Sequence, residues 1–160
     1  MDIKDLIHLD KDGDGEPDYK ISEDGRSIII DAIDEAMEVV QDFINEKLNG
    51  YGCEKKILSQ IRLAVEEIFV NIISYAYNPD IGKAEVRCEV DDEPLSVTIE
   101  FMDSGKQFDP LARGEADTSG AMFMDHPGGF GIHLVKKTMD NVEYEYKDGK
   151  NILTIKKNLK

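Results

Sequence analysis

The 160-residue sequence has no tryptophan, only two cysteines, and only 19 lysines and arginines against 34 aspartates and glutamates. Cys53 and Cys88 stand in no CxxC or Cys/His spacing, which argues against a zinc site or a disulfide framework and favours two buried thiols. No apolar run approaches the roughly 18 residues of a membrane span, and no basic region with a long apolar stretch opens the chain. The formal charge of -15 repels nucleic acid and anionic lipid. We therefore expect a cytoplasmic protein that binds neither nucleic acid nor membrane.

The composition that is present, 41% apolar and 33% charged residues, is typical of one soluble globular domain. A chain of this length can bury roughly two-thirds of its unfolded surface, so a core forms without a disulfide or metal. The first residues differ from the rest because they are rich in aspartate and glutamate. We divide the chain into an acidic lead-in over 1–18 and a single domain over 19–160.

Two segments have the periodicity of amphipathic helices. Apolar residues recur at intervals of three and four over 31–48, where Asn49-Gly50 ends the pattern, and again from Lys55 to about Tyr77, where Asn78-Pro79 ends it. Each segment is therefore predicted to be a helix with one buried face, the second longer than the first.

The rest of the chain is predicted to form hairpins. Apolar and polar residues alternate over 84–90 and again over 95–101, on either side of a turn at 91–94. A short helix is expected after Gly131, and 142–146 and 151–156 flank a turn at Asp148-Gly149. These elements predict an α+β fold, a two-layer sandwich with helices on one face of a mixed, mostly antiparallel sheet.

Polar residues interrupt the apolar face of the second predicted helix. Glu67 and Asn71 are four residues apart, so both project from one side of that helix. One interpretation is an exposed carboxylate beside a surface amide. The other is a general base beside a neutral oxygen ligand for Mg²⁺.

A second polar residue stands where the alternation calls for an apolar one. Counting by two from Leu95 places Asp103 on the apolar face at the end of the strand. Gly105 follows, and the Asp-Ser-Gly sequence is either an ordinary turn or a site where Asp103 accepts a hydrogen bond from a ligand amine while Gly105 lets that ligand approach.

The third feature is Pro127-Gly-Gly-Phe-Gly131, which leads directly into a helix. Glycines there leave N–H groups and the positive end of the helix dipole open to an anion such as phosphate, although a flexible hinge is also compatible. The pattern is neither the P-loop nor the dinucleotide fingerprint.

These three features occur in the order of a known family. The segments Glu67-Ile-Phe-Val-Asn71, Asp103-Ser-Gly105 with Phe108-Asp-Pro110, and Gly128-Gly-Phe-Gly131 resemble the N, G1 and G2 boxes of the GHKL (Bergerat-fold) ATPases. The resemblance covers about 19–160 and is closest to the small anti-sigma factor serine/threonine kinases. It implies a mixed sheet backed by helices, with ATP and Mg²⁺ bound between the sheet and the long helix.

The resemblance also implies roles for individual residues. Glu67 would be the general base that acts on a protein serine, and Asn71 the protein ligand to Mg²⁺. Asp103 would accept the adenine amine, with Gly105 giving the base room. The remaining implied contacts with ATP come from Gly129 and Gly131 at the phosphates, Thr154 near the Asp103–adenine network, and Arg113 at the γ-phosphate.

The chain departs from the family pattern at three places. Tyr75 stands where relatives usually carry histidine, and Gln107 replaces the second glycine of the G1 box. The segment 114–125, which corresponds to the lid, is short and rich in methionine.

The acidic lead-in supports a separate hypothesis. Asp10, Asp12, Asp14 and Asp18 fit positions of a calcium loop, but Ile21 occupies the position where a closing carboxylate belongs. Ca²⁺ binding therefore competes with a solvated acidic segment.

Two functions follow from the family resemblance. The first is an ATP-dependent protein kinase that phosphorylates a serine on a STAS-type anti-sigma antagonist in a partner switch. The second is a nucleotide-gated module that sequesters a sigma factor or other regulator without transferring phosphate. A homodimer is left open in both.

Overall fold

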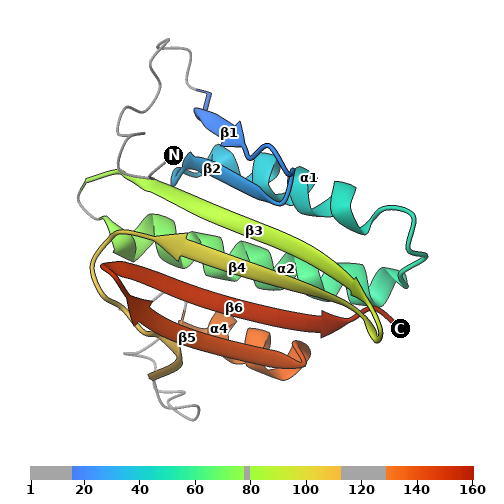
Figure 1. Cartoon of the computed structure of the whole chain (residues 1–160). Helices are drawn as coiled ribbons and strands as arrows, with labels where there is room; N and C mark the ends of the chain where they lie inside the picture. The colour runs from blue at the N-terminus through green and yellow to red at the C-terminus, as the bar shows by residue number, and fades with distance from the viewer. Residues whose placement is uncertain (1–15, 78–79, 113–128) are drawn as a thin grey trace.

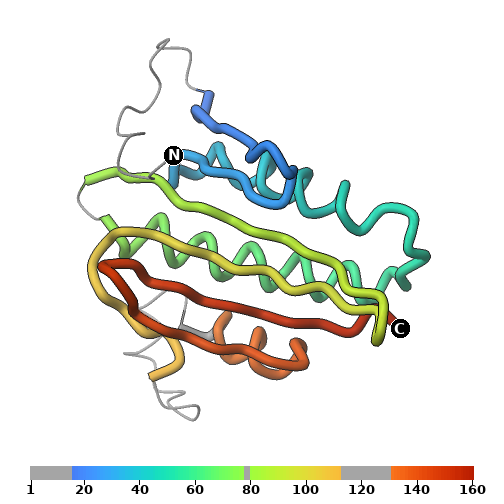
Figure 2. Tube along the Cα trace, viewed as in Figure 1, coloured from blue at the N-terminus to red at the C-terminus, as the bar shows by residue number. Residues whose placement is uncertain are grey.

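The computed structural model describes residues 16–77, 80–112 and 129–160. Six strands form one sheet in the order β1-β2-β3-β4-β6-β5. The strands are β1 (Tyr19–Ile21), β2 (Ser27–Asp31), β3 (Lys83–Asp92), β4 (Leu95–Asp103), β5 (Asn141–Lys147) and β6 (Lys150–Asn158). Figure 2 shows the β1–β2 and β5–β6 hairpins at opposite edges, with β3 and β4 between them.

The helices α1 (Ala36–Leu48), α2 (Lys55–Asn71) and α4 (Gly129–Thr138) lie on one face of this sheet (Figure 1). The π-helix η2 (Ile72–Ala76) continues α2, and the short 3-10 helix η3 (Pro110–Ala112) follows β4. The predicted two-layer α+β fold is confirmed. Every strand pairing within the described residues is antiparallel, so the mixed character that we expected of the sheet is not found there.

The core lies between the sheet and the helices because the strands alternate as their sequences predict. Val86 pairs with Phe101 and Cys88 with Ile99, and all four side chains are at most 1% exposed on the helix side. Burial raises the pKa of the Cys88 thiol to about 12, so it is an inert core residue. Cys53 is also free but only half-buried, contrary to the prediction of two buried thiols.

The first predicted helix begins later than expected. Residues 27–31 form β2 instead of leading into the helix, and α1 starts at Ala36. The Ser-Ile-Ile-Ile-Asp sequence favours a strand because β-branched side chains pack well on a pleated surface. Ile28 and Ile30 are fully buried opposite Val86 and Ala84. Pairing with β3 therefore makes Asp31 the end of a strand and not the start of the predicted helix.

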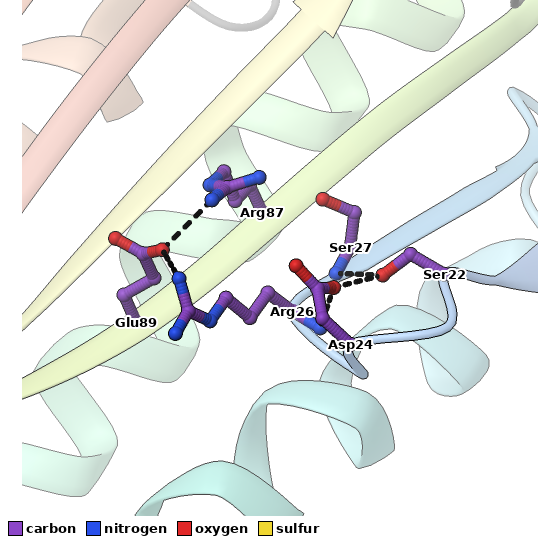
Figure 3. A network of polar contacts seen from close by, with 6 residues as sticks. All are labelled: Ser22, Asp24, Arg26, Ser27, Arg87 and Glu89. Carbon is purple, nitrogen blue, oxygen red and sulfur yellow. Dashed lines mark hydrogen bonds and ion pairs between the residues drawn. The ribbon is translucent and has the colours of Figure 1, made fainter.

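The open face of the sheet carries polar contacts that join the N-terminal hairpin to β3. Figure 3 shows Glu89 of β3 accepting hydrogen bonds from Arg26 and Arg87, at 3.1 and 2.9 Å. In the adjoining turn, Asp24 accepts from the Ser22 hydroxyl at 2.6 Å. Both ion pairs are substantially exposed, so each contributes about 1 kcal/mol or less.

A buried ion pair closes the other end of the same strand pairing. Lys83 of β3 binds Asp31 of β2, and the two side chains are 5% and 0% exposed. Asp31 also accepts a hydrogen bond from the Asp18 backbone N–H at 2.8 Å, which ties the chain before β1 to the sheet.

None of the helices in the described ranges combines the length and the apolar character of a membrane span.

Candidate functional site

A cavity of about 40 Å³ lies between the sheet and the C-terminal end of α2. Phe101 and Leu153 contribute its apolar sheet side, and Asn71, Asp103 and Asn151 contribute polar groups. The cavity is partly open and not enclosed, so its volume does not by itself limit the size of a ligand that enters from outside.

Asp103 is at the end of β4 and faces the helices, as its place in the alternation predicts. Its Oδ1 atom accepts hydrogen bonds from the Gly105 backbone N–H and from Asn151 Nδ2, both at 2.9 Å. Its Oδ2 atom has no hydrogen-bond partner among the described residues. Burial raises the pKa of Asp103 above its ordinary value of 3.8, while the two hydrogen bonds act in the opposite direction. One carboxylate oxygen is therefore held by the protein and the other is available to a ligand.

Asn151 of β6 holds Asp103 and the following loop together. Its Nδ2 group donates to Asp103 Oδ1 and to the Lys106 carbonyl, each at 2.9 Å. Its Oδ1 atom accepts from the Phe108 N–H at 3.1 Å and from the Tyr144 hydroxyl at 2.5 Å. A carboxamide has two donor hydrogens and two acceptor lone pairs, so this side chain has no capacity left. Asn151 therefore positions other groups and does not bind the ligand itself.

The sequence analysis missed Asn151 and chose Thr154 instead. In the β4–β6 register Asn151 is the partner of Asp103, whereas Thr154 pairs with Glu100. Side chains alternate along a strand, so Thr154 lies on the face of the sheet opposite to Asp103. The prediction that Thr154 reaches Asp103 is wrong. Counting forward from Gly149 in steps of two would have identified Asn151, because Leu153 and Ile155 share its buried face.

Glu67 and Asn71 both lie near the C-terminal end of α2, but they differ in surroundings. Asn71 is 8% exposed, lines the cavity and makes no side-chain hydrogen bond within the described residues. Glu67 is half-buried and outside the cavity lining. Burial raises the pKa of Glu67 above its ordinary value of 4.5, and the neighbouring Glu66 carboxylate adds to that shift.

Two of the predicted glycines pack closely against other residues. A Cβ atom on Gly131, in α4, would overlap the Glu67 carboxylate. A Cβ atom on Gly105 would overlap the carbonyl of Ala76, and the Lys106 N–H donates to that carbonyl at 2.7 Å. Glycine is therefore required at Gly105 by the Ala76 backbone, whereas a side chain at position 131 would need only the flexible end of Glu67 to shift. Gly129 is the first residue of α4.

Only some of the remaining predicted residues lie within the described part of the chain. Arg113, Asp10, Asp12 and Asp14 lie outside the described residues, as does the segment 114–125. Within those described, no group of three or more His, Cys, Asp or Glu side chains is arranged to hold a metal ion. Asp18 is described, and its backbone pairs with Asp31.

The two departures from the box patterns lie beside the cavity. The Tyr75 ring stacks on Phe108, a cavity-lining residue, with ring centroids 5.2 Å apart. Gln107 precedes Phe108 and is exposed. Tyr75 therefore contacts the cavity lining through Phe108.

Comparison with known proteins identifies the family. Residues 30–157 match the family described as the histidine kinase-like ATPase domain, and the chain belongs to this family. It is similar to the serine/threonine-protein kinase BtrW of Bordetella bronchiseptica, with 26% identity over 59% of this chain and 66% of that protein. It is also similar to the anti-sigma F factor of Caldanaerobacter subterraneus, with 28% identity over 60% and 66% of the two chains. Serine-protein kinase RsbW of Bacillus cereus is 25% identical over 68% and 69%. The matched segments thus span about two-thirds of these relatives.

The environment of Asp103 leads to a pH-dependent prediction for the free protein. The pKa of Asp103 is higher in the folded state, so folding favours the protonated carboxyl group. The stability that this preference contributes is fully present below the unfolded pKa of about 3.9 and is lost as the pH rises through the folded pKa. Asp103→Asn should therefore be more stable than the wild type in urea at pH 7, and the difference should shrink as the pH approaches 4.

Exposed Asp92 provides the control for this experiment. Asp92→Asn should leave the urea midpoint nearly unchanged at both pH values. A lower midpoint for Asp103→Asn at pH 7 would mean that the hydrogen bonds from Asn151 and Gly105 outweigh the burial of the charge.

Proposed function

We propose that this chain binds ATP with Mg²⁺ at the cavity and acts as an anti-sigma-factor-type regulator that phosphorylates a serine of a STAS-type antagonist. The observation that carries the proposal is the half-satisfied Asp103 carboxylate, aimed into a cavity beside Asn71 in a histidine kinase-like ATPase chain. The names of the relatives, two kinases and an anti-sigma factor, support the partner-switch part of the proposal.

Asp103 recognises the adenine ring in this account. Its Oδ2 atom accepts a hydrogen from the 6-amino group, which guanine lacks at that position, while Oδ1 stays bound to Asn151 and Gly105. Phe101 and Leu153 supply the apolar surface under the base.

Asn71 is suited to a magnesium ion. Its carboxamide oxygen is a neutral, hard ligand on the cavity wall, and its side chain makes no competing hydrogen bond within the described part of the chain. Mg²⁺ commonly takes only one or two protein ligands and completes its shell with phosphate oxygens and water. When bound, the ion neutralises charge on the phosphates, which offsets the shortage of basic residues in this acidic chain.

Glu67 is the proposed general base. It stands one helical turn before Asn71, and burial raises its pKa above the ordinary value of 4.5, which makes the carboxylate a stronger base. It takes the hydroxyl proton of the substrate serine as that oxygen bonds to the γ-phosphorus of ATP, and ADP leaves. Gly131 allows the α4 backbone to pack directly against this side chain.

The alternative is a nucleotide-gated module that binds a sigma factor or other regulator without catalysis. The position of Glu67 favours it, because this carboxylate is outside the cavity lining and packs against Gly131. Both functions require ATP binding, so the adenine site is tested first and phosphate transfer second.

The adenine site is tested with a pair of β6 variants. Asn151→Ala removes the donor that holds Asp103 and should weaken ATP binding about tenfold or more, because loss of a buried hydrogen bond to a charged group costs about 1.5–3 kcal/mol. Thr154→Ala, on the opposite face, should change the affinity less than about twofold. Calorimetric titration with ATP and Mg²⁺ measures the affinity of both variants. An equal loss of affinity in the two variants would mean that Asp103 and Asn151 are not part of the ATP site.

Phosphate transfer is tested with neighbouring glutamates of α2. Glu67→Gln keeps the shape of the side chain but removes the base, so transfer of ³²P to a STAS-type protein should fall by ~10² or more while ATP affinity changes less than about threefold. Glu66→Gln, at an exposed position on the same helix, is the matched control and should retain most of the transfer, because it removes only the smaller cause of the raised pKa of Glu67.

The outcome separates the two proposed functions. Wild-type protein that binds ATP and its partner but transfers no phosphate, with Glu67→Gln indistinguishable from it, would leave the nucleotide-gated module as the function.

A further inference from the structure

Tyr77 immediately follows the π-helix at the end of α2 and is half-buried. Its hydroxyl donates a hydrogen bond to the Lys83 carbonyl at 2.5 Å and accepts one from the Ser104 N–H at 2.9 Å. One phenol oxygen thus joins the first residue of β3 to the residue that follows Asp103.

The Tyr77 hydroxyl stands where the β3–β4 ladder would continue. The last pair of the register at this end is Ala84 with Asp103, so the next pair would be Lys83 with Ser104. The hydroxyl bridges the N–H and C=O groups of these two residues in place of a direct backbone bond. The hydroxyl therefore separates β3 from β4 at the point where the chain continues from β4 into the loop beside the cavity.

The neighbouring residues leave room for the Tyr77 ring and hold the loop that its hydroxyl contacts. A Cβ atom on Gly82 would overlap the Tyr77 ring, so a larger residue there would displace it. The preceding residue, Ala76, accepts a hydrogen bond from the Lys106 N–H at 2.7 Å. Residues 76 and 77 consequently hold the loop at two points, on either side of Gly105, whose own N–H binds Asp103.

We propose that the Tyr77 hydroxyl is a positioning group that directs the Asp103 carboxylate toward the amino group of the base, and so determines selectivity for a 6-aminopurine. This inference rests on the proposed ATP-binding function and extends it to a residue that does not line the cavity. Burial raises the pKa of Tyr77 to about 12, so the hydroxyl keeps its proton throughout the neutral pH range.

Removal of the hydroxyl has a defined structural consequence. Tyr77→Phe removes the bridge between the Ser104 N–H and the Lys83 C=O, so the Ser104 N–H loses the partner that it has in the wild type. The two groups can pair directly by extending the ladder by one residue. That movement draws Ser104 toward β3 and turns the Asp103 carboxylate away from the ligand.

The test compares ATP with purine riboside triphosphate, which lacks the 6-amino group but is otherwise the same nucleotide. Wild-type protein should bind ATP more tightly, and Tyr77→Phe should reduce that preference about fivefold or more by weakening ATP binding selectively. Tyr51→Phe, in the loop between α1 and α2, is the matched control and should keep the wild-type preference. Gly82→Ala displaces the ring without deleting the hydroxyl and should reduce the preference in the same direction.

The outcomes distinguish this inference from the proposed function. If the wild type prefers ATP and both the Tyr77 and Gly82 variants keep that preference, or lose affinity for the two nucleotides equally, Tyr77 has only a structural role and the inference is overturned. If the wild type does not distinguish the nucleotides, the proposed adenine site is wrong. Gly82→Ala decides the question if Tyr77→Phe does not fold.

Discussion

The candidate site depends on the burial of one carboxylate with only half of its hydrogen-bonding capacity used. Asp103 is 5% exposed, and the contacts from Asn151 and Gly105 are both made to the same oxygen atom. A buried carboxylate is unfavourable unless its oxygens are satisfied, and Asp103 lines a cavity while both of its hydrogen bonds are made by Oδ1. The same feature that lowers the stability of the free protein thus provides the energetic advantage of ligand binding.

The elements around Asp103 are arranged to maintain this state. The saturated side chain of Asn151 joins β6, β5 and the loop after β4. From the other side, Ala76 at the end of the π-helix and Tyr77 directly after it contact the same loop. π-helical turns are frequent at functional sites. The long helix that carries Glu67 and Asn71 is therefore coupled directly to the residues that hold Asp103.

Sequence reasoning predicted the parts of this architecture that depend on local periodicity. The long helix, both hairpins of the central and C-terminal strands and the inward direction of Asp103 follow from intervals of two or of three and four. It missed β1 and β2 because 27–31 is short and its pairing with β3 depends on residues more than fifty positions away. It chose Thr154 over Asn151 because the correct residue depends on the register between β4 and β6. The contacts of Tyr77 depend on three segments meeting, which no local pattern encodes.

The most direct measurement is a crystal structure of the wild-type protein with Mg²⁺ and a non-hydrolysable ATP analogue. The account predicts that the 6-amino nitrogen lies within about 3.2 Å of Asp103 Oδ2, while Asn151 keeps its bonds to Asp103 Oδ1 and the Lys106 carbonyl. An adenine ring bound elsewhere, or an Asn151 side chain turned toward the base with Asp103 unliganded, would contradict it.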